Sequence, residues 1–132
     1  MRRFLFLTLW LLLMVFPVAL FRRIPQIRPI MDTLIGTEVM HWIAHSVLFA
    51  GLVILLAYAF KLPLTLKNVA LLLFAVLIVG AAQEAFQLIA TKHRPPGFPE
   101  LFDLGVDMIG GLIGIGLLYL KRSTRQRIRV GY

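Results

Sequence analysis

The stretch NVALLLFAVLIVGAAQEAFQLIA, residues 68–90, is apolar along almost its whole length and holds one charged side chain, Glu84. An α-helix over this stretch would measure about 34 Å at 1.5 Å per residue, which exceeds the roughly 30 Å hydrocarbon core of a bilayer. Backbone amides find no water inside a bilayer, so only helices and closed barrels cross it. The stretch therefore predicts a transmembrane helix.

Further stretches of this kind cover residues 4–21, 39–60 and 101–120, and none shows the two-residue alternation of a barrel strand. Apolar residues make up 60% of the 132 residues and the mean hydropathy is +0.88, whereas soluble domains are about 45 to 50% apolar. We expect a single all-α domain, residues 1–132. It would be a polytopic membrane protein with four transmembrane helices in an antiparallel bundle.

The first stretch lies between two pairs of arginines and has the charged start and apolar core of a signal peptide. No A-x-A-like cleavage site follows it, and basic residues close it on both sides. We expect a retained helix. The connection over residues 22–38 contains two prolines, and its structure cannot be predicted from the sequence.

The net charge of +8 does not indicate nucleic acid, because the basic residues lie at the ends of the apolar stretches. One side holds Arg2, Arg3, Lys61, Lys67, Lys121, Arg122, Arg125, Arg127 and Arg129; the other holds Arg22, Arg23, Arg28, Lys92 and Arg94. This asymmetry predicts both termini in the cytoplasm, with the basic tail, residues 121–132, against anionic lipid headgroups. Cysteine is absent, which excludes disulfides and thiol chemistry.

Ionisable side chains inside a span cost about 2.5 to 3.5 kcal/mol each on insertion scales, and they are therefore candidates for function. Here ionisable or polar side chains recur every three or four residues within a span: His41 and His45, then Glu84 and Gln87, then Asp103 and Asp107. His45, Glu84 and Asp107 each lie about 9 Å inside the same membrane face. We predict an extracytoplasmic polar pocket, with Arg94 from the loop above as counter-charge. Its residues are His45, Glu84, Gln87, Arg94, Asp103 and Asp107.

Gly110 and Gly114 form a G-x-x-x-G step in the last stretch, which lets helix backbones approach closely. Small residues at Ala81, Ala82 and Ala85 of the preceding stretch are the expected partner. This contact would press the polar residues of the two helices together.

The residues QEAFQ at 83–87, Arg94 in the next loop, and the D-x-x-x-D-x-x-G-x-x-x-G of residues 103–114 resemble the VanZ-like family, as does the H-x-x-x-F that begins at His45. Where family members commonly have Asp-Lys before that histidine, this chain has His41-Trp42. The resemblance implies a small multi-helix membrane protein. The family takes its name from a protein linked to teicoplanin resistance, and its chemistry is not established.

We consider several roles for these residues. As a binding pocket, they would recognise a cationic or hydrogen-bonding group of a lipid-linked envelope precursor or glycopeptide and contribute to antibiotic tolerance. As a packing knot, they would only fix helix register. The chain would alternatively be an accessory subunit of a larger membrane complex, because a small bundle leaves much lipid-facing surface for other subunits.

An enzymatic role, with His45 or Glu84 as general base and Asp107 as orienter, lacks an evident nucleophile. A metal held by His41, His45, Glu84 and Asp107 is disfavoured, because His41 beside Trp42 is typical of an interfacial polar tip. We therefore assign no catalytic residue, no metal and no cofactor, and the expected partners are membrane lipid and the ligands or subunits named above.

Overall fold

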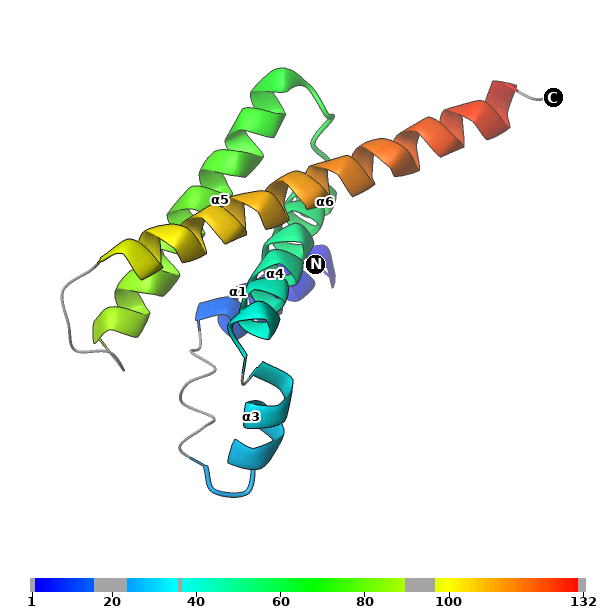
Figure 1. Ribbon diagram of the computed structural model, residues 1–132. Coiled ribbons are helices and arrows are strands. Elements are labelled where there is room, and N and C mark those ends of the chain that lie inside the picture. Colours follow the sequence, from blue (N-terminus) through cyan, green and yellow to red (C-terminus); the bar gives the residue numbers. More distant parts are fainter. Residues whose placement is uncertain (1, 16–23, 36, 90–96, 131–132) are drawn as a thin grey trace.

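The computed structural model describes residues 2–15, 24–35, 37–89 and 97–130, and these residues form helices and turns with no strand. The helices are α1 (Arg2–Val15), α3 (Arg28–Ile35), α4 (Glu38–Ala59), α5 (Leu66–Gln87) and α6 (Phe98–Val130) (Figure 1). Among the described residues, α4, α5 and the part of α6 up to Thr124 are long and apolar enough to cross a membrane. The predicted all-α class is confirmed.

The helix starts are capped by side chains of the residue types that favour them. Thr37 Oγ1 accepts from the Met40 N–H at 3.2 Å at the start of α4, and Thr65 does the same for Asn68 at the start of α5. At the start of α6 the side chain of Glu100 accepts from the Gly97 N–H at 2.8 Å, as the acidic residue of a capping box does. Each span therefore has a defined first turn.

Helix α4 ends in a turn that places Lys61 in the left-handed region, with a φ of 52°. The Leu62 N–H donates to the Ala57 carbonyl at 3.0 Å, and the Lys61 N–H donates to the Tyr58 carbonyl at 3.4 Å. These two bonds define a Schellman motif, in which glycine is the usual left-handed residue. A lysine in this conformation carries backbone strain that a glycine would avoid.

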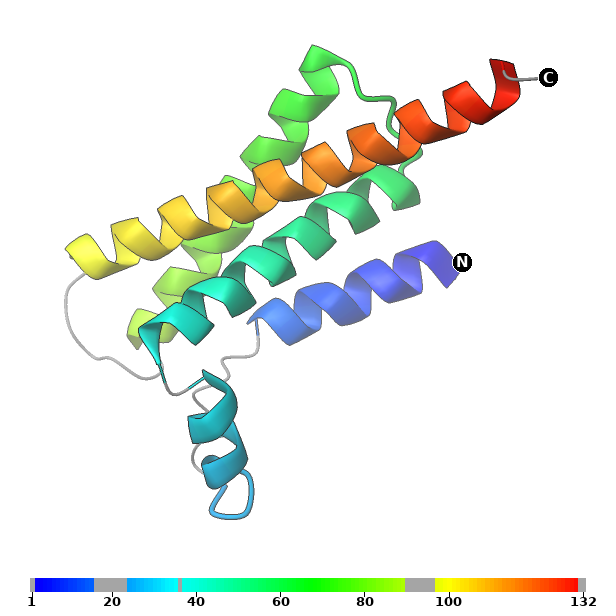
Figure 2. The same ribbon diagram turned by 45° about the vertical axis from the view of Figure 1, so that its right-hand side comes forward.

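Helices α4 and α6 lie side by side and run in the same direction (Figure 2). A Cβ added at Gly110 would lie 2.5 Å from the backbone oxygen of Ser46, and one added at Gly114 would lie 2.7 Å from that of Ala50. The backbones can approach this closely only because both positions lack a side chain. The glycine step is thus the contact between α6 and α4.

The predicted partner of the glycine step is wrong. Ala81, Ala82 and Ala85 are exposed on α5 and take no part in a helix contact at Gly110 or Gly114. Both α4 and α5 offer small residues, and the direction in which each glycine faces decides between them. Helix α5 instead packs antiparallel to α6 through another face, where Gly111 meets Val76.

Helix α1 packs against α4 in the opposite direction. The Trp10 indole N–H donates to the Leu48 carbonyl at 2.9 Å, and Phe4 meets Phe60 edge to face with ring centroids 5.6 Å apart. The described part of α1 is about 21 Å long at 1.5 Å per residue, shorter than a bilayer core. The remainder of the predicted span at residues 4–21 lies outside the described residues, so a fourth transmembrane helix stays a prediction.

The interior is a small apolar core whose fully buried members come from α1, α4 and α5: Met14, Phe49, Leu52, Val53, Leu72 and Val76. In the most apolar part of each candidate span only 28% of the residues are buried inside the molecule. Large apolar side chains such as Leu71, Phe74 and Leu112 therefore point outward. An outer face of this composition fits an apolar solvent better than water.

The helix bounds differ from the predicted ones chiefly in α6. The helix begins three residues before the predicted stretch of residues 101–120, because proline is tolerated in a first helical turn and Pro99 lies there. It also continues through the predicted tail as far as Val130, past the end of α4 (Figures 1 and 2). The short helix α3 lies in the connection whose structure the sequence left open.

Candidate functional site

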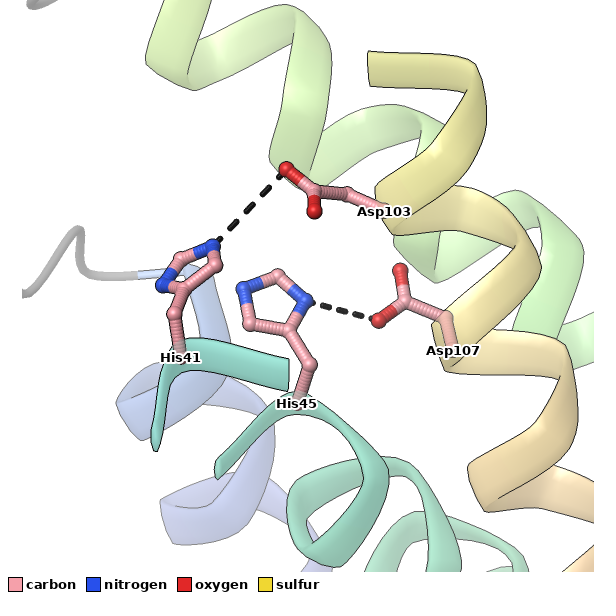
Figure 3. A network of polar contacts seen from close by, with 4 residues as sticks. All are labelled: His41, His45, Asp103 and Asp107. Carbon is pink, nitrogen blue, oxygen red and sulfur yellow. Dashed lines mark hydrogen bonds and ion pairs between the residues drawn. The ribbon is translucent and has the colours of Figure 1, made fainter. Parts of the chain in front are cut away.

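A histidine of α4 and an aspartate of α6 form a buried polar pair. His45 Nδ1 lies 2.7 Å from Asp107 Oδ1, and their side chains are 5% and 0% exposed (Figure 3). The position of this pair follows from the glycine step, in which Gly110 contacts the Ser46 backbone. Ser46 follows His45 in α4, and Gly110 lies less than one turn after Asp107 in α6. Close approach of the backbones brings these short side chains within hydrogen-bond distance.

A second pair lies one turn nearer the helix N-termini. His41 Nε2 is 3.7 Å from Asp103 Oδ2, and these side chains are 36% and 13% exposed. The histidines are four residues apart on α4 and the aspartates four apart on α6, so the two pairs stand one above the other (Figure 3). The rings of His41 and His45 have centroids 4.3 Å apart. Exposure therefore decreases from the pair of His41 and Asp103, which we call the half-exposed pair, to the pair of His45 and Asp107, which is buried.

Helix α5 closes the buried pair from the third side. A Cβ at Gly80 would lie 2.8 Å from Asp107 Oδ2, so the missing side chain leaves room for this carboxylate. Gln83 and Glu84, one turn further along α5, are both buried. We call the set formed by His41, His45, Gln83, Glu84, Asp103 and Asp107 the polar layer.

The buried oxygen atoms of the polar layer that find no hydrogen-bond partner among the described residues include Asp107 Oδ2 and Gln83 Oε1. An unsatisfied buried acceptor costs about 1 to 3 kcal/mol, and more when it carries charge. The other carboxylate oxygen of Asp107 is taken by His45. A neutral His45 that donates from Nδ1 presents Nε2 as an acceptor, which adds to the acceptors Asp107 Oδ2 and Gln83 Oε1.

Aromatic side chains flank the half-exposed pair. Trp42 follows His41 on α4, Phe102 precedes Asp103 on α6, and their rings lie 5.1 Å apart at a tilt of 55°. This contact joins the first turns of the two helices beside His41 and Asp103. It helps to hold the pair at a level where the His41 side chain is 36% exposed and that of Asp103 is 13% exposed.

The structure brings together most of the predicted pocket residues. His45, Glu84, Asp103 and Asp107 belong to the polar layer, and Gln87 is half-buried one turn beyond Gln83. Arg94 lies outside the described residues.

Two residues of the polar layer are missing from the predicted pocket: Gln83, and His41, which we interpreted as an interfacial tip. For His41, the spacing of four residues from His45, matched by the two aspartates, was the available signal. Within the described ranges, no group of three or more histidine or acidic side chains is placed to hold a metal ion.

The chain was also compared with protein-family models, with curated proteins and with solved structures, and nothing matches in any of the three. Inferences about function therefore rest on the residues and geometry of the polar layer.

Proposed function

We propose that the chain is an integral protein of the bacterial inner membrane, with four transmembrane helices in an up-and-down bundle and both termini in the cytoplasm. Three helices of spanning length and an outward apolar surface support the membrane assignment. The basic residues gather where α1 begins and α4 ends, which supports the orientation. In this orientation the polar layer lies near the extracytoplasmic face.

We further propose that the protein is VanZ-like and that the polar layer binds a ligand at that face. The motifs at residues 83–87 and 103–114 support the family assignment. The structural support is that Glu84 and Asp107, one from each motif, lie in the same buried layer. The ligand would be a lipid-linked envelope precursor or a glycopeptide, and binding would contribute to antibiotic tolerance.

The observation that carries the binding proposal is the buried Oδ2 atom of Asp107, which has no hydrogen-bond partner within the part of the chain that the structure describes. A carboxylate in an apolar bundle is stabilised by donors or by positive charge. The ligand group is therefore an amine, a guanidine or an amide N–H. Envelope precursors and glycopeptides both carry such groups on their peptide portions.

The half-exposed pair is the entrance to the layer. The 3.7 Å contact between His41 Nε2 and Asp103 Oδ2 is longer than a hydrogen bond, so an incoming donor can bond to Asp103 without breaking one. The deeper bond of 2.7 Å then holds Asp107 in position. Binding would extend from the membrane interface toward Gly80.

The test is expression of the chain in a glycopeptide-susceptible bacterium, with teicoplanin tolerance and protein abundance measured together. We expect Glu84→Ala, Asp107→Ala and Arg94→Ala each to abolish tolerance when tolerance is compared at equal protein abundance. Glu38→Gln serves as the control, because it removes an exposed carboxylate at the same helix end outside the layer. Unchanged tolerance in all three variants would show that the layer is only a packing feature.

The second candidate, an accessory subunit, is favoured by the exposed apolar side of α1. Leu5, Phe6, Leu9, Leu12 and Leu13 are all exposed on it. Lipid would cover the same side chains, so isolation in mild detergent distinguishes the two. A stoichiometric membrane partner that co-purifies with the wild type and is lost with Leu9→Ser would support the subunit.

A further inference from the structure

Basic side chains gather at the end of the molecule opposite the polar layer. This end contains the start of α1, the end of α4 and the start of α5 (Figure 2). Two contacts tie it together. The Arg3 guanidinium lies 5.3 Å from the centroid of the Tyr58 ring, and Arg122 of α6 donates to the Leu62 carbonyl at 2.7 Å. Lys61 is adjacent to Leu62 in the turn after α4, so cations from α1, α6 and this turn lie around the end of α4.

All six carboxylate residues of the chain lie elsewhere in the sequence: Asp32, Glu38, Glu84, Glu100, Asp103 and Asp107. Every one falls in α3, in the first turn of α4, near the end of α5 or in the first turns of α6. The cations at the opposite end therefore cannot be neutralised by a side chain of their own chain. None of the described carboxylate side chains lies at this end, so an anion from outside the protein can supply the counter-charge.

The two arginines are held in place and keep donors to offer. A guanidinium has five N–H donors, and the bond from Arg122 to the Leu62 carbonyl uses one nitrogen. The Arg3 guanidinium carbon lies over the Tyr58 ring, and this contact with a ring face uses no hydrogen-bond acceptor. Planar guanidinium groups bind phosphate oxygens in pairs, while a lysine such as Lys61 adds a point charge.

Exposed aromatic and apolar side chains surround these cations. Phe4, Tyr58, Phe60 and Tyr119 are each about half or more exposed. Aromatic residues at the ends of spanning helices are typical of the bilayer interface, where rings lie at headgroup level. The cations can bind the phosphate of a phospholipid headgroup. The exposed rings and the apolar helix surface beside them can contact its acyl chains.

We propose that this end of the molecule is a binding site for the headgroup of an anionic phospholipid, formed by Arg3, Lys61 and Arg122. The phosphate would lie against the last turn of α4, and the acyl chains would run along the exposed apolar side of the bundle. Because the site lies at the opposite end from the polar layer, it does not depend on the function proposed for that layer.

The test uses the full chain in detergent with lipid added, and native mass spectrometry to measure retention of phosphatidylglycerol against phosphatidylcholine. We expect wild type to retain phosphatidylglycerol preferentially. Neutralising Lys61→Gln or Arg122→Gln should lower this preference about fivefold each, which corresponds to about 1 kcal/mol per basic residue at an anionic surface. Arg28→Gln removes the same charge at the other end and should leave the preference unchanged.

Three results would overturn the proposal. The first is equal retention of both lipids by wild type, and the second is a preference for phosphatidylglycerol that survives the double variant Lys61→Gln/Arg122→Gln. The third is loss of bound phosphatidylglycerol when inorganic phosphate is added at millimolar concentration, which would identify a site for free phosphate. Arg122→Lys keeps the charge but not the planar fork, and intermediate retention by this variant would support the paired contact.

Discussion

His45 and Asp107 interact by a single short contact inside an apolar bundle. A buried pair of this kind gains from mutual attraction but loses the hydration of both partners, so its net contribution to stability is small. Removing one partner is different, because the other is then buried without compensation. The pair therefore fixes which turns of α4 and α6 face each other more than it adds to the free energy of unfolding.

A double-mutant cycle tests this interpretation. We expect His45→Leu and Asp107→Leu each to lower the free energy of unfolding by about 3 kcal/mol, whereas the double variant should differ from wild type by much less than the sum. Unfolding in mixed micelles, followed by tryptophan fluorescence, gives the three values. Additive losses would mean that the two side chains act separately.

At the scale of helices, the contact between α4 and α6 depends on the absence of side chains at two glycines. We expect Gly110→Ala to lower the free energy of unfolding by about 1 to 3 kcal/mol, since its Cβ would lie 2.5 Å from the Ser46 carbonyl oxygen. The matched control is Gly105→Ala on the same helix, where no described atom lies within 4 Å. That variant should be neutral or up to about 1 kcal/mol more stable, because alanine favours helix.

The same unfolding assay measures both substitutions. Equal effects would indicate that the glycines matter through helix propensity and not through the contact with α4.

The end of α4 gives a prediction of the opposite sign. Lys61→Gly should be about 1 kcal/mol more stable than Lys61→Ala, because glycine adopts the left-handed conformation without the clash of a Cβ. Both variants lose the same charge, so their difference reports the backbone alone. A thermal unfolding series of the two proteins in one detergent is sufficient, and an advantage for alanine would contradict the observed φ.

At the scale of the molecule, the segregation of charge implies an orientation in the membrane. The chain has no cysteine, so a single introduced thiol is a unique label site. We expect Glu38→Cys to react with a membrane-impermeant maleimide in intact cells. Thr124→Cys should react only after the cells are permeabilised, because it lies at the basic end of α6. Labelling of both in intact cells would rule out the proposed topology.

The three described helices of spanning length and four residues of the polar layer, His45, Glu84, Asp103 and Asp107, could be predicted from the sequence. Helix formation over α4 and α5 follows from the length and apolar composition of each segment, which depend on no distant contact. Likewise, a charged residue such as Glu84 or Asp107 is costly wherever it lies in an apolar span, so the residue type alone marks it.

The choice of partners was decided by the tertiary structure. Gly110 and Gly111 are neighbours in the chain, yet one meets α4 and the other meets α5, because successive residues of a helix point about 100° apart. Both α4 and α5 contain small residues, so composition alone allowed the glycine step of α6 to pack against either helix. The orientation of α4 and α6 about their own axes also places His41 opposite Asp103, one turn from the pair of His45 and Asp107. This pairing of residues is seen only once the helices are packed. Local composition determines which segments enter the apolar phase, whereas side-chain packing determines how they face each other there.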